Sequence, residues 1–246
     1  MEEVTLTERC EPRGLKIVVL PGLDGMAALR SEFRAQLAPE FQACVIEYPV
    51  NLVRYDDLLD WTRTKLPAQN YIIVAESFSG PLAIQLAAES PAQLKGLVFV
   101  ATFATAPRKL PAAVWGLLRL VPLHLKMSSM IAQPLMMGRW RNAAFTNLFH
   151  ESNKCVPAST IRGRVREVLS VDCAAKLDMI DVPYIYLGAS HDRSVPRLAA
   201  DDFRQGAQSV RFVEGPHFLL QAVPKAAAEH VEAFVRSLPQ RRSRAL

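Results

Sequence analysis

The chain has 246 residues, half of them hydrophobic, and a formal net charge of +5. This length fits one domain with a single core, and the composition is that of a globular protein rather than a disordered or fibrous one. No apolar run is long enough to predict a membrane span, and the polar residues 1–10 lack the pattern of a secretory signal, so we expect a cytoplasmic protein. The four cysteines are widely spaced, which gives little support for a zinc site or a disulfide framework.

Apolar, β-branched runs predict the strands. Five strong runs and one weak one occur, in chain order, at residues 14–20, 43–47, 71–75, 96–102, 184–189 and, weakly, 210–213. All but the last are continuously apolar, which is typical of strands that are buried on both faces of a parallel sheet. Within the second run, Cys44 is expected to be a small buried residue.

Helical patterns fill the intervals between these runs, at residues 29–37, 56–66, 79–89, 195–205 and 224–238. The alternation predicts an α/β fold with a mostly parallel central sheet flanked by helices. It stops between residues 106 and 173, where prolines divide a stretch rich in leucine and methionine into helical pieces. We therefore predict a core of residues 1–105 and 174–246, with a helical lid inserted at residues 106–173. This insertion is called the lid segment below.

The third strand run leads directly into Ala75-Glu76-Ser77-Phe78-Ser79-Gly80 and then into a helix rich in alanine and leucine. A serine between a strand and a helix is typical of the nucleophile elbow Gly-x-Ser-x-Gly, whose tight turn needs small residues two places before and after the serine. Ala75 and Ser79 are small but are not glycines. Taken alone, the motif fits an ordinary serine-rich helix N-cap equally well.

Two further residues favour the catalytic interpretation of Ser77. A serine hydroxyl needs a base, and the base needs an acid that fixes its tautomer. Asp192 follows the fifth strand run and His217 follows the sixth, in the chain order serine, acid, histidine that is expected for this type of site. Backbone N–H groups of Phe78 and Leu23 are the candidate oxyanion donors, although Pro21-Gly22 also fits a plain turn.

These motifs resemble those of the α/β-hydrolase superfamily over about residues 14–238. The similarity is closest to small bacterial carboxylesterases and thioesterases, including the esterases that act on pimeloyl-acyl-carrier-protein methyl ester. The family's His-Gly is here Pro21-Gly22, and its elbow glycines are replaced. Its Gly…Asp…Val-Pro signature is present as Gly188, Asp192 and Val195-Pro196. The resemblance implies an ester, thioester or related acyl substrate, with no metal and no cofactor.

The lid segment suggests what this substrate is. Its apolar residues include Met127, Met130 and Met136, which we expect to bind an acyl chain, although packing alone also accounts for such residues. Ten basic but only three acidic side chains lie between residues 106 and 172. This charge would attract an acidic acyl carrier protein, with Arg162 and Arg166 as contacts, but a merely soluble basic surface is an equal alternative.

Three functions therefore remain open: a carboxylesterase acting on short or medium acyl esters, a thioesterase specific for coenzyme A or carrier-linked acyl groups, and a non-catalytic binding protein. Nucleic-acid binding is not expected, because the arginines are not interleaved with aromatic residues.

Overall fold

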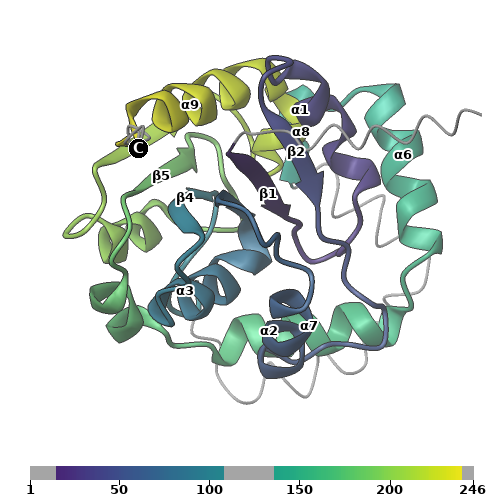
Figure 1. Cartoon of the computed structure of the whole chain (residues 1–246). Helices are drawn as coiled ribbons and strands as arrows, with labels where there is room; N and C mark the ends of the chain where they lie inside the picture. The colour runs from purple at the N-terminus through teal and green to yellow at the C-terminus, as the bar shows by residue number, and fades with distance from the viewer. Residues whose placement is uncertain (1–14, 108–135, 240–246) are drawn as a thin grey trace, which may run out of the picture.

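The computed structural model describes residues 15–107 and 136–239. A single six-stranded sheet lies at the centre, with the strand order β2-β1-β3-β4-β5-β6 and every neighbouring pair parallel (Figure 1). The strands are β1 (Lys16–Leu20), β2 (Gln42–Val45), β3 (Tyr71–Glu76), β4 (Leu94–Val100), β5 (Tyr184–Ala189) and β6 (Ser209–Val213). All six predicted strands are confirmed, including the weak sixth.

Successive residues of each strand face opposite sides of the sheet and enter two separate cores. On β1, Ile17 and Val19 face the side that is covered by α1 (Ser31–Gln36), α8 (Leu219–Ala222) and α9 (Pro224–Ser237). Val18 and Leu20 face α2 (Tyr55–Arg63) and α3 (Gly80–Ala88) on the other side (Figure 1). This alternation explains why the strands read as continuous apolar runs: both faces are removed from water.

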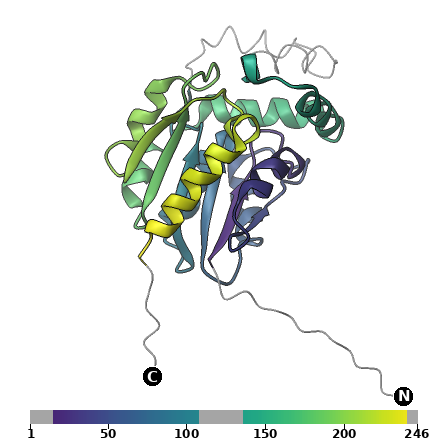
Figure 2. The ribbon, with the colours of Figure 1, turned by 90° about the horizontal axis from the view of Figure 1, so that it is seen from above.

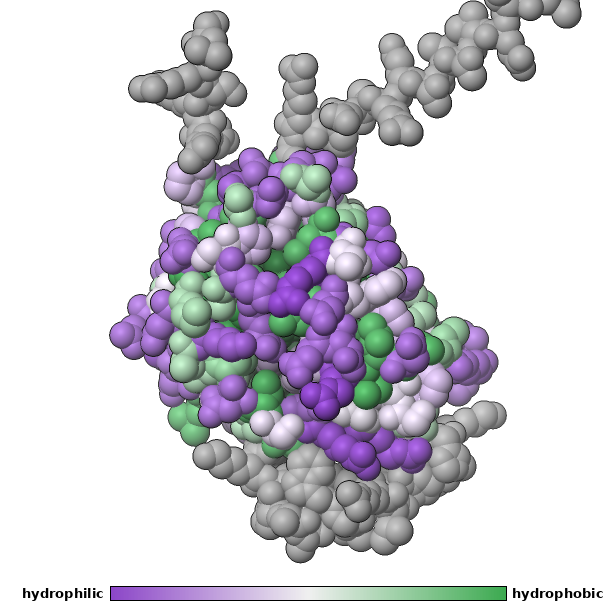
Figure 3. Space-filling view, turned by 60° about the horizontal axis from the view of Figure 1, so that its bottom comes forward, coloured by the Kyte–Doolittle hydropathy of each residue, from purple (hydrophilic) through white to green (hydrophobic). Residues whose placement is uncertain are grey.

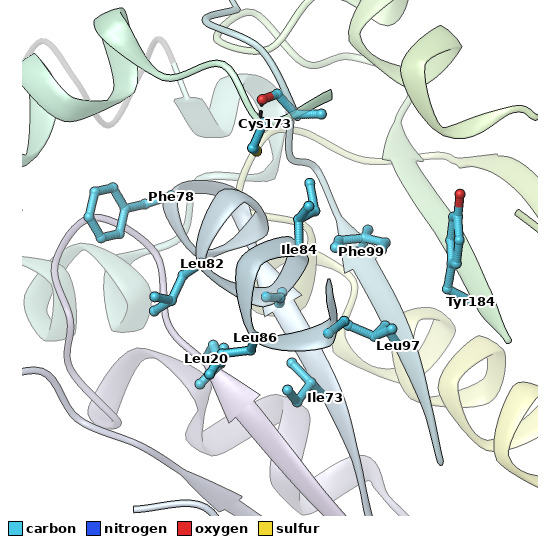
Figure 4. Packing of buried hydrophobic residues seen from close by; sticks show 14 of the residues in the cluster. Leu20, Ile73, Phe78, Leu82, Ile84, Leu86, Leu97, Phe99, Cys173 and Tyr184 are labelled. Atoms are coloured by element: carbon cyan, nitrogen blue, oxygen red, sulfur yellow. Dashed lines mark hydrogen bonds between the residues drawn. The ribbon is translucent and has the colours of Figure 1, made fainter. Parts of the chain in front are cut away.

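Helix α3 supplies much of the second core. Its residues Leu82, Ile84 and Leu86 pack over Ile73 and Leu97 of the sheet (Figure 4). Each of these side chains is almost completely buried. A buried leucine or isoleucine contributes about 1.5–3 kcal/mol relative to an exposed one. The segment that follows Ser77 is therefore held rigidly against the sheet.

One prediction about local structure is confirmed in part and another was wrong. The segment 195–205 is helical over Arg197–Phe203, but as a 3₁₀ helix rather than an α-helix, and two adjacent aspartates near its C-terminal end are unfavourable for continued helix. Cys44 is exposed rather than buried, because β2 is an edge strand of the described sheet and alternates between exposed and half-buried positions. The remaining 3₁₀ helices cover Ala28–Arg30, Ser77–Ser79, Gly138–Trp140 and Ala174–Met179.

The described part of the lid segment contains α6 (Ala143–Lys154) and α7 (Ala158–Ser170), which lie across one end of the sheet (Figure 2). The side chain of Asn142 caps α6 by accepting a hydrogen bond of 2.8 Å from the Phe145 amide. The ends of the segment lie side by side, because Thr105 and Asp172 form an antiparallel bridge. Met127 and Met130 lie outside the described residues.

The surface over α2, α3 and α7 is mainly hydrophilic, with small scattered apolar patches (Figure 3). Large exposed hydrophobic side chains in residues 15–107 and 136–239 are Val50, Met179 and Leu198. None of the described helices combines the length and hydropathy that a membrane crossing requires.

Candidate active site

The turn between β3 and α3 places Ser77 in a strained backbone conformation. Its φ is 51°, in the left-handed region that side chains other than glycine seldom occupy. The Thr102 hydroxyl donates a hydrogen bond to the Ser77 carbonyl and helps to hold this turn. A Cβ at Gly80 would lie 2.0 Å from Thr102 Oγ1, so the close approach that requires a glycine falls three residues after the serine. Strained serines of this kind are typical of nucleophile elbows.

Ser79 departs from the elbow glycine, and the structure gives a reason for its presence. Its side chain is fully buried, and its hydroxyl donates a hydrogen bond to the carbonyl of Pro21. Because that proton is used, the hydroxyl of Tyr48, 2.6 Å away, acts as the donor to Ser79 Oγ. Glycine could make neither bond. Ser79 therefore ties the elbow to the loop that contains Leu23.

Ser77, His217 and Asp192 form one continuous chain of hydrogen bonds. Ser77 Oγ is 2.9 Å from His217 Nε2, and His217 Nδ1 is 2.8 Å from Asp192 Oδ2. Asp192 Oδ1 accepts from the backbone amides of Ser194 and Val195, at 2.7 and 2.8 Å. The acid is thus fixed at one oxygen while its other oxygen orients the histidine. The structure brings together all three residues that the sequence singled out.

The pKa of His217 is raised above its ordinary value of 6.5. Burial by itself lowers this pKa, because it disfavours the charged imidazolium. The charge and hydrogen bond of Asp192, with a smaller increase from the charge of Glu76, together outweigh burial. A histidine in this environment is a stronger base than a free one, as proton abstraction from a serine requires.

The backbone around Leu23 is shaped into a tight loop with a free donor. The Gly22 carbonyl accepts from the Gly25 amide at 3.0 Å, and the Leu23 carbonyl accepts from Arg164 at 3.0 Å. Within the described residues the Leu23 N–H has no acceptor. The Phe78 N–H lies in the first turn of a helix, where amides have no intrahelical acceptor. Both predicted oxyanion donors are therefore available.

A buried charge cluster beside the elbow was not anticipated from the sequence. Arg30 is fully buried and donates to Glu76 Oε2 at 2.7 Å and to Asp24 Oδ2 at 2.5 Å. Gln221 also donates to Glu76, at 3.3 Å. The cluster joins the Leu23 loop to the residue that precedes Ser77. The only signal in the sequence is a glutamate at the end of an otherwise apolar strand.

The predicted substrate-binding methionine, Met136, is half-buried, whereas its neighbour Met137 is completely buried. Met137 packs in a cluster with Phe145 and Phe149 of α6 and with Phe218, whose ring lies 5.9 Å from that of His217. This third core brings apolar side chains of the lid segment to the histidine. The sequence did not predict this cluster, because it does not show which of the neighbouring residues Met136 and Met137 faces the core.

The two predicted carrier contacts lie on α7. Arg162 is half-buried and Arg166 is exposed, whereas Arg164 between them is fully buried. In residues 15–107 and 136–239, no group of three histidine, cysteine or acidic side chains is placed to hold a metal ion together.

Comparison of the sequence with protein families and with curated proteins gives no match. Comparison of the structure with solved structures gives clear similarities. A bromoperoxidase from Bacillus anthracis aligns with a TM-score of 0.78 at 12% identity, over 91% of this chain and 92% of that one. An esterase from Exiguobacterium antarcticum aligns with a TM-score of 0.77 at 14% identity, over 91% and 92%. A hydrolase from Pseudomonas aeruginosa aligns with a TM-score of 0.72 at 18% identity, over 90% of each chain. The chain has the α/β-hydrolase fold.

Proposed function

We propose that the protein is a serine carboxylic-ester hydrolase that acts through an acyl-enzyme on short or medium acyl esters. The observation that carries this proposal is the unbroken hydrogen-bond chain from Ser77 through His217 to Asp192, with Ser77 held in a left-handed turn. A hydrogen-bonded arrangement of these three residue types in this order has little structural purpose apart from activating a hydroxyl.

In the proposed reaction, Ser77 Oγ attacks the ester carbonyl carbon while His217 Nε2 takes its proton. The carbonyl oxygen becomes an oxyanion that accepts hydrogen bonds from the Leu23 and Phe78 amides. Collapse of this intermediate breaks the bond to the alcohol, which leaves with the proton from His217. Water then attacks the acyl-enzyme by the same route, and the acid is released from Ser77.

The apolar cluster of Met137, Phe145, Phe149 and Phe218 supports an apolar acyl group. It borders His217 on the side of the lid segment, where a chain extending from the reacting carbonyl would be shielded from water. The esterase and hydrolase among the structural neighbours agree with a hydrolytic activity but say nothing of the acyl group. The proposed substrates include a carrier-linked ester such as pimeloyl-acyl-carrier-protein methyl ester.

A fluorophosphonate probe tests the proposal directly, because it reacts covalently with an activated serine. We expect labelling of the wild type and of Ser170→Ala, an exposed serine on α7 that serves as a matched control, but not of Ser77→Ala. Absence of labelling in the folded wild type would overturn the proposal and favour a non-catalytic binding protein.

Turnover of p-nitrophenyl esters from acetyl to lauroyl, measured beside acyl-coenzyme A thioesters, then defines the substrate. We expect ester hydrolysis with an initial burst of p-nitrophenol, since the acyl-enzyme forms before it is hydrolysed. Faster turnover of the thioesters would replace the esterase assignment by that of a thioesterase using the same residues.

A further inference from the structure

Arg164, in the middle of α7, is fully buried and donates four hydrogen bonds to backbone carbonyls of the core. Its Nη1 donates to the Leu23 carbonyl at 3.0 Å. Its Nη2 donates to the carbonyls of Pro49 and Leu52, both at 3.0 Å, and Nε reaches Leu52 at 3.2 Å. One side chain of the lid segment thus holds two separate loops of the core.

The surrounding core is shaped to accept this guanidinium. Gly25 has a φ of 73°, and a Cβ at this position would lie 2.6 Å from Arg164 Nη1. The Gly25 carbonyl also accepts from the Tyr48 amide at 2.9 Å, which joins the Leu23 loop to the segment leading to Pro49. A side chain at position 25 would displace Arg164 from the Leu23 carbonyl, so the loop conformation and the arginine require each other.

The positive charge of Arg164 is not neutralised by direct contact with an acid. Among the described residues it forms no ion pair, in contrast to buried Arg30, which contacts both Asp24 and Glu76. Burial lowers the pKa of Arg164, but a guanidinium stays protonated at neutral pH. Its Cζ lies 5.9 Å from the ring centre of Phe78, whose amide is the second candidate oxyanion donor.

We propose that Arg164 is a positioning residue for the oxyanion hole. By fixing the Leu23 carbonyl it orients the loop that presents the Leu23 amide, and its Cζ lies 5.9 Å from the ring centre of Phe78. Docking of the lid helix α7 and formation of a competent oxyanion hole are then a single event. This inference rests on the proposed ester hydrolysis and assigns the lid segment a role in the chemical step.

Four variants separate the contribution of the Arg164 charge from that of its hydrogen bonds. Arg164→Met keeps much of the packing and removes the charge and all hydrogen bonds, whereas Arg164→Lys keeps the charge but loses the planar fork. Arg141→Met is the matched control, because Arg141 lies in the same lid segment and its side chain is exposed. Circular dichroism and thermal unfolding establish that each variant is folded.

The measurements are kcat and KM for a p-nitrophenyl ester, and the inhibition constant of a trifluoromethyl ketone, whose adduct on a serine carries an oxyanion. We expect Arg164→Met to lower kcat by about 10- to 100-fold with little change in KM, and to weaken the ketone by a similar factor. Arg164→Lys should lose less of its kcat, and Arg141→Met should match the wild type. Added methylguanidinium should partly restore Arg164→Ala.

Unchanged kcat in folded Arg164→Met would overturn the proposal, and so would a loss of kcat without a matching loss of ketone affinity. If neither Arg164→Met nor Arg164→Lys folds, the residue is structural and the proposal also fails. These outcomes are distinct from failure of the proposed function, in which the wild type itself neither hydrolyses the ester nor reacts with the fluorophosphonate.

Discussion

Replacing Asp192 by asparagine changes one atom and should reverse the tautomer of His217. Asp192 Oδ1 accepts from two backbone amides, so the asparagine oxygen will take this position and its NH₂ group will face His217. His217 Nδ1 must then act as an acceptor, because it lies only 2.8 Å from the substituted atom. The proton moves to Nε2, which faces Ser77 Oγ and can no longer receive the serine proton.

The expected loss in kcat is about 10⁴-fold, which corresponds to about 5 kcal/mol of transition-state stabilisation. The pH dependence should change as well. Asp192 is the main group that raises the pKa of His217, and burial, which lowers it, remains in the variant. The midpoint of the residual activity should therefore lie at a lower pH than in the wild type.

The free energy of unfolding should also depend on pH through the pKa of His217. Because the pKa of His217 is raised in the folded protein, its protonation stabilises the fold below its ordinary pKa of 6.5, and this stabilisation is lost as the pH rises through the folded-state pKa. Asp192→Asn removes the partner of the imidazolium. The variant should consequently lose more stability near pH 5 than near pH 9.

The assay is steady-state hydrolysis of a p-nitrophenyl ester across pH, with thermal unfolding at both ends of the range. Asp178→Asn is the matched control, since Asp178 is exposed. A loss of less than about tenfold in a folded variant would refute the tautomer argument, because that argument removes the base entirely. A midpoint that moves to higher pH would refute the assignment of Asp192 as the dominant electrostatic partner.

Three further predictions concern the elbow and the lid segment. Gly80→Ala should unfold or strongly destabilise the protein, by roughly 1–3 kcal/mol or more in chemical denaturation, because the new Cβ would meet Thr102 at 2.0 Å. Ser79→Ala should keep the fold but lower kcat and the free energy of unfolding, the latter by about 1–3 kcal/mol, because a buried hydroxyl partner is left unpaired; Ser79→Gly should behave alike, and wild-type values in both would contradict this role. If the substrate is carrier-linked, the double variant Arg162→Glu, Arg166→Glu should have a reduced kcat/KM for an acyl-carrier-protein methyl ester but an unchanged kcat/KM for a p-nitrophenyl ester. An unchanged kcat/KM for the carrier-linked ester would exclude a carrier contact at these residues.

The sheet and the three site residues could be predicted because their signals are local. Each buried strand is a continuous apolar run. Ser77 follows one of these strands directly, and Asp192 and His217 lie in the short loops after two others. In a parallel sheet the carboxyl ends of the strands share one edge, so the position after a strand already places a residue at the site.

The supporting residues could not be predicted because their roles depend on long-range contacts. Arg30 and Arg164 look like surface residues in the sequence, and only the tertiary structure shows that carboxylates or carbonyls compensate their burial. The same is true of Ser79, which replaces the elbow glycine in the sequence and whose hydroxyl donates to the Pro21 carbonyl of the Leu23 loop in the structure. Cys44 was misjudged for the opposite reason, since an apolar run does not reveal that a strand lies at an edge.

The position of the lid segment has a consequence for chain entropy. The segment leaves the sheet after β4 and returns at β5, which is the adjacent strand. The free energy of closing a loop grows only with the logarithm of its length, so a connection on the order of 80 residues costs about 2 kcal/mol more than one of about 10. Burial of one or two apolar side chains offsets this difference. Insertions of very different length and sequence can thus be exchanged at this point during evolution while the hydrogen-bonded residues beneath stay in place.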